Sequence, residues 1–383
     1  DYFLGGEFNN LGHMQSSPVS VEGFNLVARW NASLYHFEPL GQGLEGERVD
    51  SVLVSDMSFL VFFSGKFDYA IGQNSTKLNN IAGWNRKTSK WFPLGQGFKC
   101  QGYYLPVKKM AMNSRGLLYA LSVSVADDVG CIGTYDYIKD TWENFEFSID
   151  GSINDMVIDT TDDSDVLYIG GSFTKINDQD VQAVAMLNAT TNGTIHINPV
   201  GSTLQKYQNN DIVVYTILAL KKNVFYIGGT FNVTGSFRNT GSNVARLTEH
   251  GTFEPVGKGV YGPDDACVSS LSVGSGDFEK TRLFIGGRFD KAGDLDSQNL
   301  AQYEIDDVSG SYIPVLNGTY GPVTGLFAKE APTPPFLEFW TPLIIGLIIA
   351  DAGVLIVLLL LMILSYLQMK NILKDEYLLM PLN

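Results

Sequence analysis

The chain has 383 residues, of which 45% are hydrophobic and 17% are charged, so it can bury a large core. Its net charge of -15 argues against nucleic acid or an anionic membrane surface as a partner and is typical of a soluble surface. Its 40 glycines, 23 Phe and 18 Tyr indicate many short strands and tight turns rather than helices.

A short motif recurs along the chain: an apolar run, a glycine pair and then Phe. Full copies occupy residues 2–8, 167–173, 225–231 and 283–289, and residues 62–67 keep one glycine. The second glycines Gly171, Gly229 and Gly287 follow one another at intervals of 58 residues, and a degenerate copy without glycines lies at 117–123. Six units of this period predict an all-β propeller.

Each unit contains four runs that can be interpreted as strands. After the glycine-pair strand comes an alternating run that usually begins with Asn, and then a run that ends in Pro and Gly. The alternating runs are residues 25–30, 80–84, 183–187, 243–247 and 299–303, and the proline runs are 38–43, 92–97, 198–202, 254–259 and 313–318. Because proline cannot donate to a ladder, we expect the proline run at the outer sheet edge.

A fourth run, at residues 49–54, 153–158, 214–220 and 268–273, precedes each glycine pair. It is the most uniformly apolar of the four, so we expect it to be innermost and fully buried. Residues 321–328 match this run but stand at the end of the array, whereas the chain begins at a glycine-pair strand. Pairing the two predicts a closed six-bladed, kelch-like β-propeller over residues 1–328. Alternatively, the chain is the end of a longer array.

Two recurrent residue types have a structural and a functional interpretation. The leading Asn of the alternating strand is typical of a turn, with a ligand role as the alternative. The glycine pairs suit close backbone approach near a crowded strand end. They could also form phosphate-binding loops, but no Lys followed by Ser or Thr comes after any pair, which argues against that reading.

The composition changes after residue 328. Residues 329–339 form a proline-rich linker, and residues 340–367 predict a single transmembrane helix whose only charged residue is Asp351. Trp340 and Tyr366 lie where interfacial aromatics are expected. Lys370 and Lys374 favour a short cytoplasmic tail at 368–383, which makes the chain a type I membrane protein with an extracellular propeller. No signal peptide is visible, so we expect an upstream part to be missing.

Several residues are candidates for modification or membrane contacts. Six glycosylation acceptors precede the helix: Asn31, Asn74, Asn188, Asn192, Asn232 and Asn317. Asp351 could bind a membrane partner or be a tolerated neutral side chain. Close helix packing is favoured by a stripe of small residues: Gly346, Ala350 and Gly353. Tyr377 to Met380 fits a tyrosine-based sorting signal, or simply ends the chain.

Catalytic and metal sites are not indicated. The four histidines, His13, His36, His196 and His250, lie at unrelated positions of different units, so we predict no catalysis and no cofactor. An acidic run could bind calcium or form a solvated hairpin loop: Asp159, Asp162, Asp163 and Asp165. Cys100 and Cys131 predict a disulfide that braces the degenerate unit and leaves Cys267 unpaired.

The motif set resembles the C-terminal propeller and membrane region of the fungal bud-site-selection and polarised-growth landmark proteins of the Rax family. Residues 173–187 and 289–303 carry the likeness best, and residues 134–145 resemble a kelch repeat more distantly. The resemblance covers essentially the whole chain. It implies a glycosylated plasma-membrane protein of the cell cortex that marks growth or division sites with a small membrane partner. Family members are longer, so the chain would be a C-terminal portion.

Two classes of function follow. The first is a non-catalytic cortical landmark, an interaction module for cell polarity whose propeller binds protein or cell-wall glycan. The second is a surface or endolysosomal receptor, an adhesion propeller or a kelch-type copper oxidase. For the oxidase, no paired histidines and tyrosines can be placed in the sequence.

Overall fold

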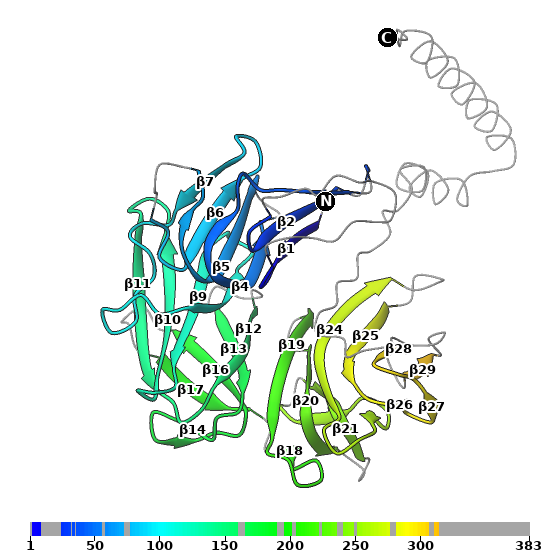
Figure 1. The fold of residues 1–383 in the computed structure, drawn as a ribbon. Helices are drawn as coiled ribbons and strands as arrows, with labels where there is room; N and C mark the ends of the chain where they lie inside the picture. Colours follow the sequence, from blue (N-terminus) through cyan, green and yellow to red (C-terminus); the bar gives the residue numbers. More distant parts are fainter. Residues whose placement is uncertain are drawn as a thin grey trace, which may run out of the picture. The chain divides into compact units, whose positions relative to one another are not determined.

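The computed structural model describes residues 2–8, 24–31, 33–34, 36–55, 58–72, 77–159, 165–189, 195–200, 204–221, 224–235, 240–248, 251–275, 281–305 and 310–313. The chain divides into two compact units, residues 1–329 and 330–383, and all described residues belong to the first. The described residues are all-β (Figure 1).

The first three sheets contain eleven strands. The first sheet consists of β1 (Tyr2–Gly5), β2 (Val27–Asn31) and β3 (His36–Glu38). The second consists of β4 (Leu44–Val54), β5 (Leu60–Ala70), β6 (Ile81–Asn85) and β7 (Lys90–Pro93). The third consists of β8 (Val107–Met112), β9 (Leu118–Ser124), β10 (Val129–Asp136) and β11 (Thr141–Ser148).

The next three sheets follow the same plan. The fourth contains β12 (Ile153–Asp159), β13 (Val166–Gly171), β16 (Val184–Ala189) and β17 (Ile195–Pro199). The fifth contains β19 (Val213–Lys221), β20 (Val224–Thr234), β21 (Thr240–Leu247) and β22 (Phe253–Pro255), with β18 (Leu204–Gln205) also on β20. The sixth contains β24 (Cys267–Ser275), β25 (Thr281–Arg288), β28 (Leu300–Glu304) and β29 (Ser311–Ile313).

Short hairpins complete the described structure. They are formed by β14 (Lys175–Ile176) with β15 (Gln179–Asp180), and by β23 (Val260–Tyr261), β26 (Lys291–Ala292) and β27 (Leu295–Asp296).

Within each main sheet the strands pair antiparallel in chain order, which confirms the predicted sequence of runs (Figure 1). The strands that end in proline, such as β7 and β22, lie at one edge of their sheets as expected. The first strands of consecutive sheets contact one another, as β8 and β12 do. Successive antiparallel sheets joined in this way form a propeller-like fold.

A β-bulge interrupts the first strand at the same place in five sheets. The register shifts between Val49 and Ser51, Val107 and Lys109, Ile153 and Asp155, Val214 and Thr216, and Val268 and Ser270. In four of these sheets the buried residue that opens the bulge lies opposite a glycine of the repeated motif, as Val214 lies opposite Gly229. The bulge is therefore part of the repeat.

The glycine pairs are explained by close approach on two sides. A Cβ on Gly229 would overlap the carbonyl oxygen of Val213, and the same holds for Gly65, Gly171 and Gly287 against the residue before their own bulge. A Cβ on the first glycine, Gly228, would overlap the Val268 side chain of the next sheet. The second glycine thus allows two strands of one sheet to approach closely, and the first glycine allows the next sheet to pack closely.

The third sheet keeps this geometry without glycine. Ser122 lies opposite Val107, in the place of the second glycine, and its Oγ donates a hydrogen bond of 2.9 Å to the carbonyl of Pro106. Pro106 precedes the bulge as Val213 does in the fifth sheet. The hydroxyl converts a steric conflict into a hydrogen bond, which explains why this unit could lose its glycines.

The leading asparagines bond the local backbone as predicted, at a turn or bend for Asn80 and Asn299 and at a register shift within β21 for Asn243. Asn243 has φ 64°, its Oδ1 accepts a hydrogen bond from the N–H of Phe231, and its Nδ2 donates to Val260 O. Asn299 has φ 63°, and its Oδ1 accepts from the N–H of Phe289. Asparagine suits this position because it tolerates the left-handed conformation and bonds the local backbone.

The fourth run of the repeat forms the first strand of each following sheet, namely β4, β12, β19 and β24. The expectation that this strand is fully buried was wrong. The glycine-pair strands β13 and β20 are almost wholly buried, whereas β4 and β19 contain several exposed and half-buried residues. On these first strands Val54 is 40% exposed and Tyr215 is 39% exposed. The glycine-pair strand is the more deeply buried because it has a neighbour on both sides, and the first strand carries a row of polar residues.

Aromatic side chains join the outer parts of neighbouring sheets. Trp91 Nε1 donates to Leu40 O at 3.1 Å, Trp142 Nε1 donates to Leu94 O at 3.0 Å, and Tyr312 Oη donates to Val256 O at 2.9 Å. The three acceptor carbonyls all lie in the Pro-apolar-Gly runs. The Pro-apolar-Gly run therefore ends one sheet and accepts a hydrogen bond from an aromatic side chain of the next sheet.

The predicted closing strand at 321–328, the linker, the spanning helix and the tail all lie outside the described residues. Among the residues that are described, no helix is long and apolar enough to cross a membrane.

Gly229→Ala should destabilise the protein by roughly 2–3 kcal/mol, because a Cβ forces β19 and β20 apart. Thermal and denaturant unfolding would measure the loss. Gly251→Asn is the control, since Gly251 has φ 72° and open space around its Cα, and it should stay within about 0.5 kcal/mol. Equal effects of both changes would contradict the explanation.

Candidate functional site

A row of polar side chains follows the bulge on five first strands, one residue per sheet: Ser51, Lys109, Asp155, Thr216 and Ser270. Thr216 and Ser270 are each 8% exposed and Asp155 is 6% exposed, so the row is largely withdrawn from solvent. Buried polar groups need partners, and the neighbouring sheets supply them.

Asp155 is the centre of this row. Its Oδ1 lies 3.0 Å from Lys109 Nζ on the third sheet, and its Oδ2 accepts a hydrogen bond of 2.8 Å from the N–H of Ile217 on the fifth sheet. Oδ1 also accepts from the N–H of Met156 at 2.9 Å. One carboxylate of the fourth sheet thus joins three sheets.

Neighbouring contacts repeat the pattern more weakly. Asn154 Nδ2 donates to Val214 O at 3.0 Å, and the N–H of Met110 donates to Ser51 Oγ at 3.4 Å. These bonds join consecutive first strands at one level. The row therefore holds the sheets together, and its side chains serve structure.

The third sheet carries the disulfide. Cys100 and Cys131, paired in our sequence interpretation, form the bond with a Cα–Cα distance of 5.7 Å, and both residues are buried. Cys267 is a free thiol. Burial raises the pKa of the Cys267 thiol, which lowers its reactivity.

Asp165 joins the third and fourth sheets at the end of the acidic run. Its Oδ2 accepts hydrogen bonds from Tyr119 Oη at 2.6 Å and from Asn113 Nδ2 and Arg115 Nη2 at 2.8 Å each. Burial, and then the bond to Asp165, raises the pKa of Tyr119. The oxygen that calcium would need is thus surrounded by donors.

The remaining calcium candidates are described only in part. Asp159 ends β12, and Asp162 and Asp163 lie outside the described residues. Within the described ranges, no three His, Cys, Asp or Glu side chains are arranged to hold a metal ion.

A hollow of about 220 Å³ lies between the second and third sheets. Its lining is Gly46, Glu47, Lys66, Phe67, Asp68, Asn80, Tyr104 and Pro106. Lys66 Nζ pairs with Glu47 Oε1 at 2.6 Å, and Lys99 Nζ lies 4.9 Å from the centre of the Tyr104 ring. The adjacent Tyr103 is 71% exposed. Charges of both signs beside aromatic rings can bind a polar ligand.

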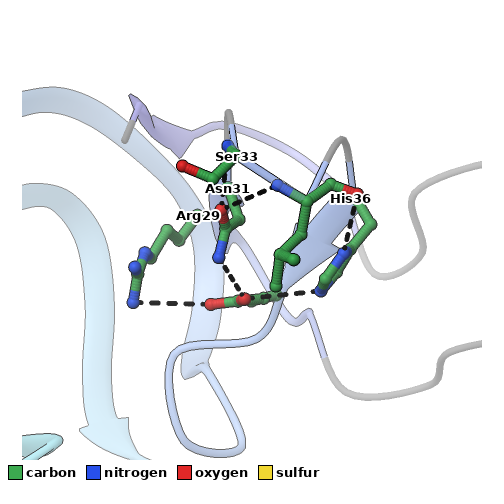
Figure 2. Close-up of polar contacts among 6 residues, drawn as sticks. Arg29, Asn31, Ser33 and His36 are labelled. Atoms are coloured by element: carbon green, nitrogen blue, oxygen red, sulfur yellow. Dashed lines mark hydrogen bonds and ion pairs between the residues drawn. The ribbon is translucent and has the colours of Figure 1, made fainter. Parts of the chain in front are cut away.

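A second polar cluster lies at the outer edge of the first sheet, where Arg29, Asn31 and His36 (Figure 2) contact Glu38 of β3. Glu38 Oε1 accepts from Asn31 Nδ2 at 2.8 Å and lies 3.3 Å from His36 Nε2, while Oε2 lies 3.4 Å from Arg29 Nη1. The Asn31 Oδ1 accepts from the N–H groups of Ser33 and Leu34. The cluster orders the turn between β2 and β3.

The other predicted site residues are scattered or undescribed. His36 and His196 lie in different sheets, and His13 and His250 are outside the described residues. Asn188 and Asn232 lie on strands β16 and β20. Outside the described ranges are Asn74, Asn192, Asn317, Gly346, Ala350, Asp351, Gly353, Tyr377 and Met380.

Sequence reasoning missed Asp155. Its run, residues 153–158, is apolar apart from Asn154 and Asp155. The signal was the polar residue at the third position of each such run, which is Ser51, Asp155, Thr216 or Ser270. A polar residue at a fixed register on a buried strand indicates a recurring contact.

No protein-family model matches the chain, and no curated protein matches it in sequence. Among solved structures, a chain described as "Crystal Structure of Mitotic Checkpoint Complex" is similar over 79% of this chain and 77% of that chain. The identity is 12% and the TM-score is 0.46. This likeness carries no argument about function, and the description of the fold rests on its strand pairing.

Asp155→Ala should cost roughly 3 kcal/mol of unfolding free energy, because it leaves the Lys109 ammonium and the Ile217 N–H without their acceptor. Denaturant unfolding would measure it. Asp50→Ala is the control: this carboxylate, whose side chain is 23% exposed against 8% for Asp155, bonds Arg48 Nε at 2.8 Å, and its loss should cost under about 1 kcal/mol. Equal costs would refute the central role of Asp155.

Proposed function

We propose that the chain is a non-catalytic, single-pass membrane protein whose extracellular propeller acts as a cortical landmark and interaction module in polarised growth. The observation that carries this proposal is the disulfide between Cys100 and Cys131. Disulfides persist in oxidising compartments and are rare in the cytosol, so the propeller belongs outside the cell or in a lumen. The apolar segment at 340–367 supplies the anchor.

The proposed propeller has six blades and closes by pairing residues 321–328 with β1. Gly6 supports this closure. Gly229 has the first strand of its sheet, β19, beside it, and a Cβ on Gly229 would overlap the Val213 carbonyl. Among the described residues, a Cβ on Gly6 meets only the Phe8 ring, at 3.3 Å. A strand from 321–328 would bring the Pro322 carbonyl to Gly6.

Gly6→Ala tests the closure. In a closed propeller it should destabilise the full chain by roughly 2–3 kcal/mol, as Gly229→Ala does, because the added Cβ meets a paired strand. Thermal unfolding would measure the change. A variant as stable as the wild type would show that β1 has an open edge.

The hollow between the second and third sheets is the proposed contact surface for the ligand. It combines the exposed Asp68 carboxylate, the Lys66 and Glu47 pair and the Tyr104 ring. Polar groups of both signs around a ring suit protein or glycan hydroxyl and amide groups, and the described lining contains no nucleophile held by a general base.

A fluorescently tagged chain in a polarised fungal cell should concentrate at cortical growth or division sites. Lys66→Glu with Tyr104→Ala should reduce that enrichment several-fold while the total surface amount is unchanged, because only ligand contact is lost. Phe59→Ala with Lys87→Glu is the matched control, since it removes another lysine and ring pair, 3.9 Å apart, outside the hollow.

The same experiment tests the alternative function of an endolysosomal receptor. For that function the wild-type chain should accumulate on internal membranes, and Tyr377→Ala should move it to the surface. A cortical pattern that Tyr377→Ala leaves unchanged favours the landmark. An even surface distribution of the wild type would contradict the landmark function.

The membrane helix is proposed to bind a partner through Asp351, because an unpaired carboxyl group is costly in hydrocarbon. Asp351→Leu should reduce co-purification of that partner from detergent extracts at least several-fold. Val354→Leu is the control for a change in apolar volume. Unchanged recovery with Asp351→Leu would show that the group is a tolerated neutral acid.

A further inference from the structure

We infer that Asn31 is an N-glycan attachment site and that the fold leaves Asn232 unmodified, although both occupy complete Asn-x-Ser/Thr acceptors. The inference rests on the proposed extracellular location of the propeller. The two residues differ in what their side-chain amides contact and in what surrounds them.

Asn31 is the last residue of β2, at the start of the turn that leads to the edge strand β3. Its Oδ1 caps the turn through the N–H groups of Ser33 and Leu34 at 3.1 and 3.2 Å, and its Nδ2 gives one hydrogen bond to Glu38 Oε1 (Figure 2). An amide nitrogen carries two hydrogens, and glycosylation replaces one of them. The one bond from Asn31 Nδ2 is therefore compatible with a sugar, and because Asn232 Nδ2 also donates one bond, the two sites are distinguished by their surroundings.

The surroundings of Asn31 are open. Ser33, Leu34 and His36 are exposed, and Leu34 alone is 62% exposed. The adjacent strand β3 lies at the edge of the first sheet. A bulky hydrophilic glycan here would shield an exposed leucine and a strand edge that no described strand pairs with, both of which are aggregation hazards.

Asn232 is half-buried like Asn31, but it lies inside a strand that is paired on both sides. It lies in β20 between Phe231 and Val233, which are fully buried, and it pairs with Gln205 of β18 on one side and Ser242 of β21 on the other. Its Nδ2 donates to Lys206 O at 2.9 Å and its Oδ1 accepts from Ser242 Oγ at 2.7 Å. We expect a sugar on Nδ2 to crowd the adjoining Lys206 carbonyl and weaken the docking of β18, whose Leu204 is 3% exposed.

The reaction transfers an oligosaccharide from a polyprenyl diphosphate donor. A bond forms between the first sugar carbon and Asn31 Nδ2, the bond from that carbon to the diphosphate oxygen breaks, and Nδ2 loses one proton to a base of the transferase. Chains that acquire a glycan at Asn232 before folding dock β18 more weakly, so we expect the folded population to carry that residue unmodified.

The test is peptide mapping of the full chain, extracted from the membranes of a eukaryotic host and deglycosylated enzymatically in heavy-oxygen water, which labels each released site as Asp. We expect label at Asn31 and none at Asn232. Label at Asn192 or Asn317 without label at Asn31 overturns the inference while leaving the extracellular location intact. Absence of label at all six acceptors overturns that location as well.

Paired variants supply an independent measurement. Ser33→Ala destroys the first acceptor but keeps the Asn31 side chain, so the full chain should lose the mobility of one glycan on a gel. Thr234→Ala destroys the second acceptor and should leave the mobility unchanged. A shift with Thr234→Ala, or none with Ser33→Ala, refutes the assignment.

Discussion

A glycine at the end of the motif faces a backbone carbonyl that a side chain at that place would overlap, at Gly65, Gly171, Gly229 and Gly287, and the repeat depends on this close approach. It brings the glycine-pair strand against the first strand where the bulge lies. The bulge in turn places one polar residue per sheet toward the neighbouring sheet, and the other glycine admits the next sheet's valine, as Gly228 admits Val268. Pairing within a sheet and packing between sheets thus share one constraint.

The third sheet shows how the constraint can be relieved. Ser122 has a hydroxymethyl group where glycine has a hydrogen, and its hydroxyl is buried beside the Pro106 carbonyl. The hydroxyl donates a hydrogen bond to that carbonyl, which makes the close approach favourable. The same sheet carries the disulfide, the Lys109 partner of Asp155 and the Tyr119 partner of Asp165. Loss of the glycines thus coincides with added covalent and polar links to its neighbours.

Much of the fold could be predicted because its signals are local. The alternation of the second strand and the position of the prolines each depend on residues near one another in sequence. The 58-residue interval is the repetition of these local patterns along the chain. Burial of the first strand could not be predicted, because it depends on which strand has neighbours on both sides. Asp155 was missed for the same reason: its partners, Lys109 and Ile217, lie in other units. Asn31 and Asn232 have equivalent acceptor motifs and became distinguishable only through their contacts.

The indole hydrogen bonds between sheets have a further consequence for the behaviour of the chain in solution. Trp91 and Trp142 each donate to a carbonyl of the preceding sheet, so each ring lies at one junction, and Trp91 also contacts Trp84 at a centroid distance of 4.9 Å. When a junction opens, its indole exchanges a protein carbonyl for water. The chain therefore carries natural optical reporters of the first two junctions, which can separate the loosening of one sheet from global unfolding.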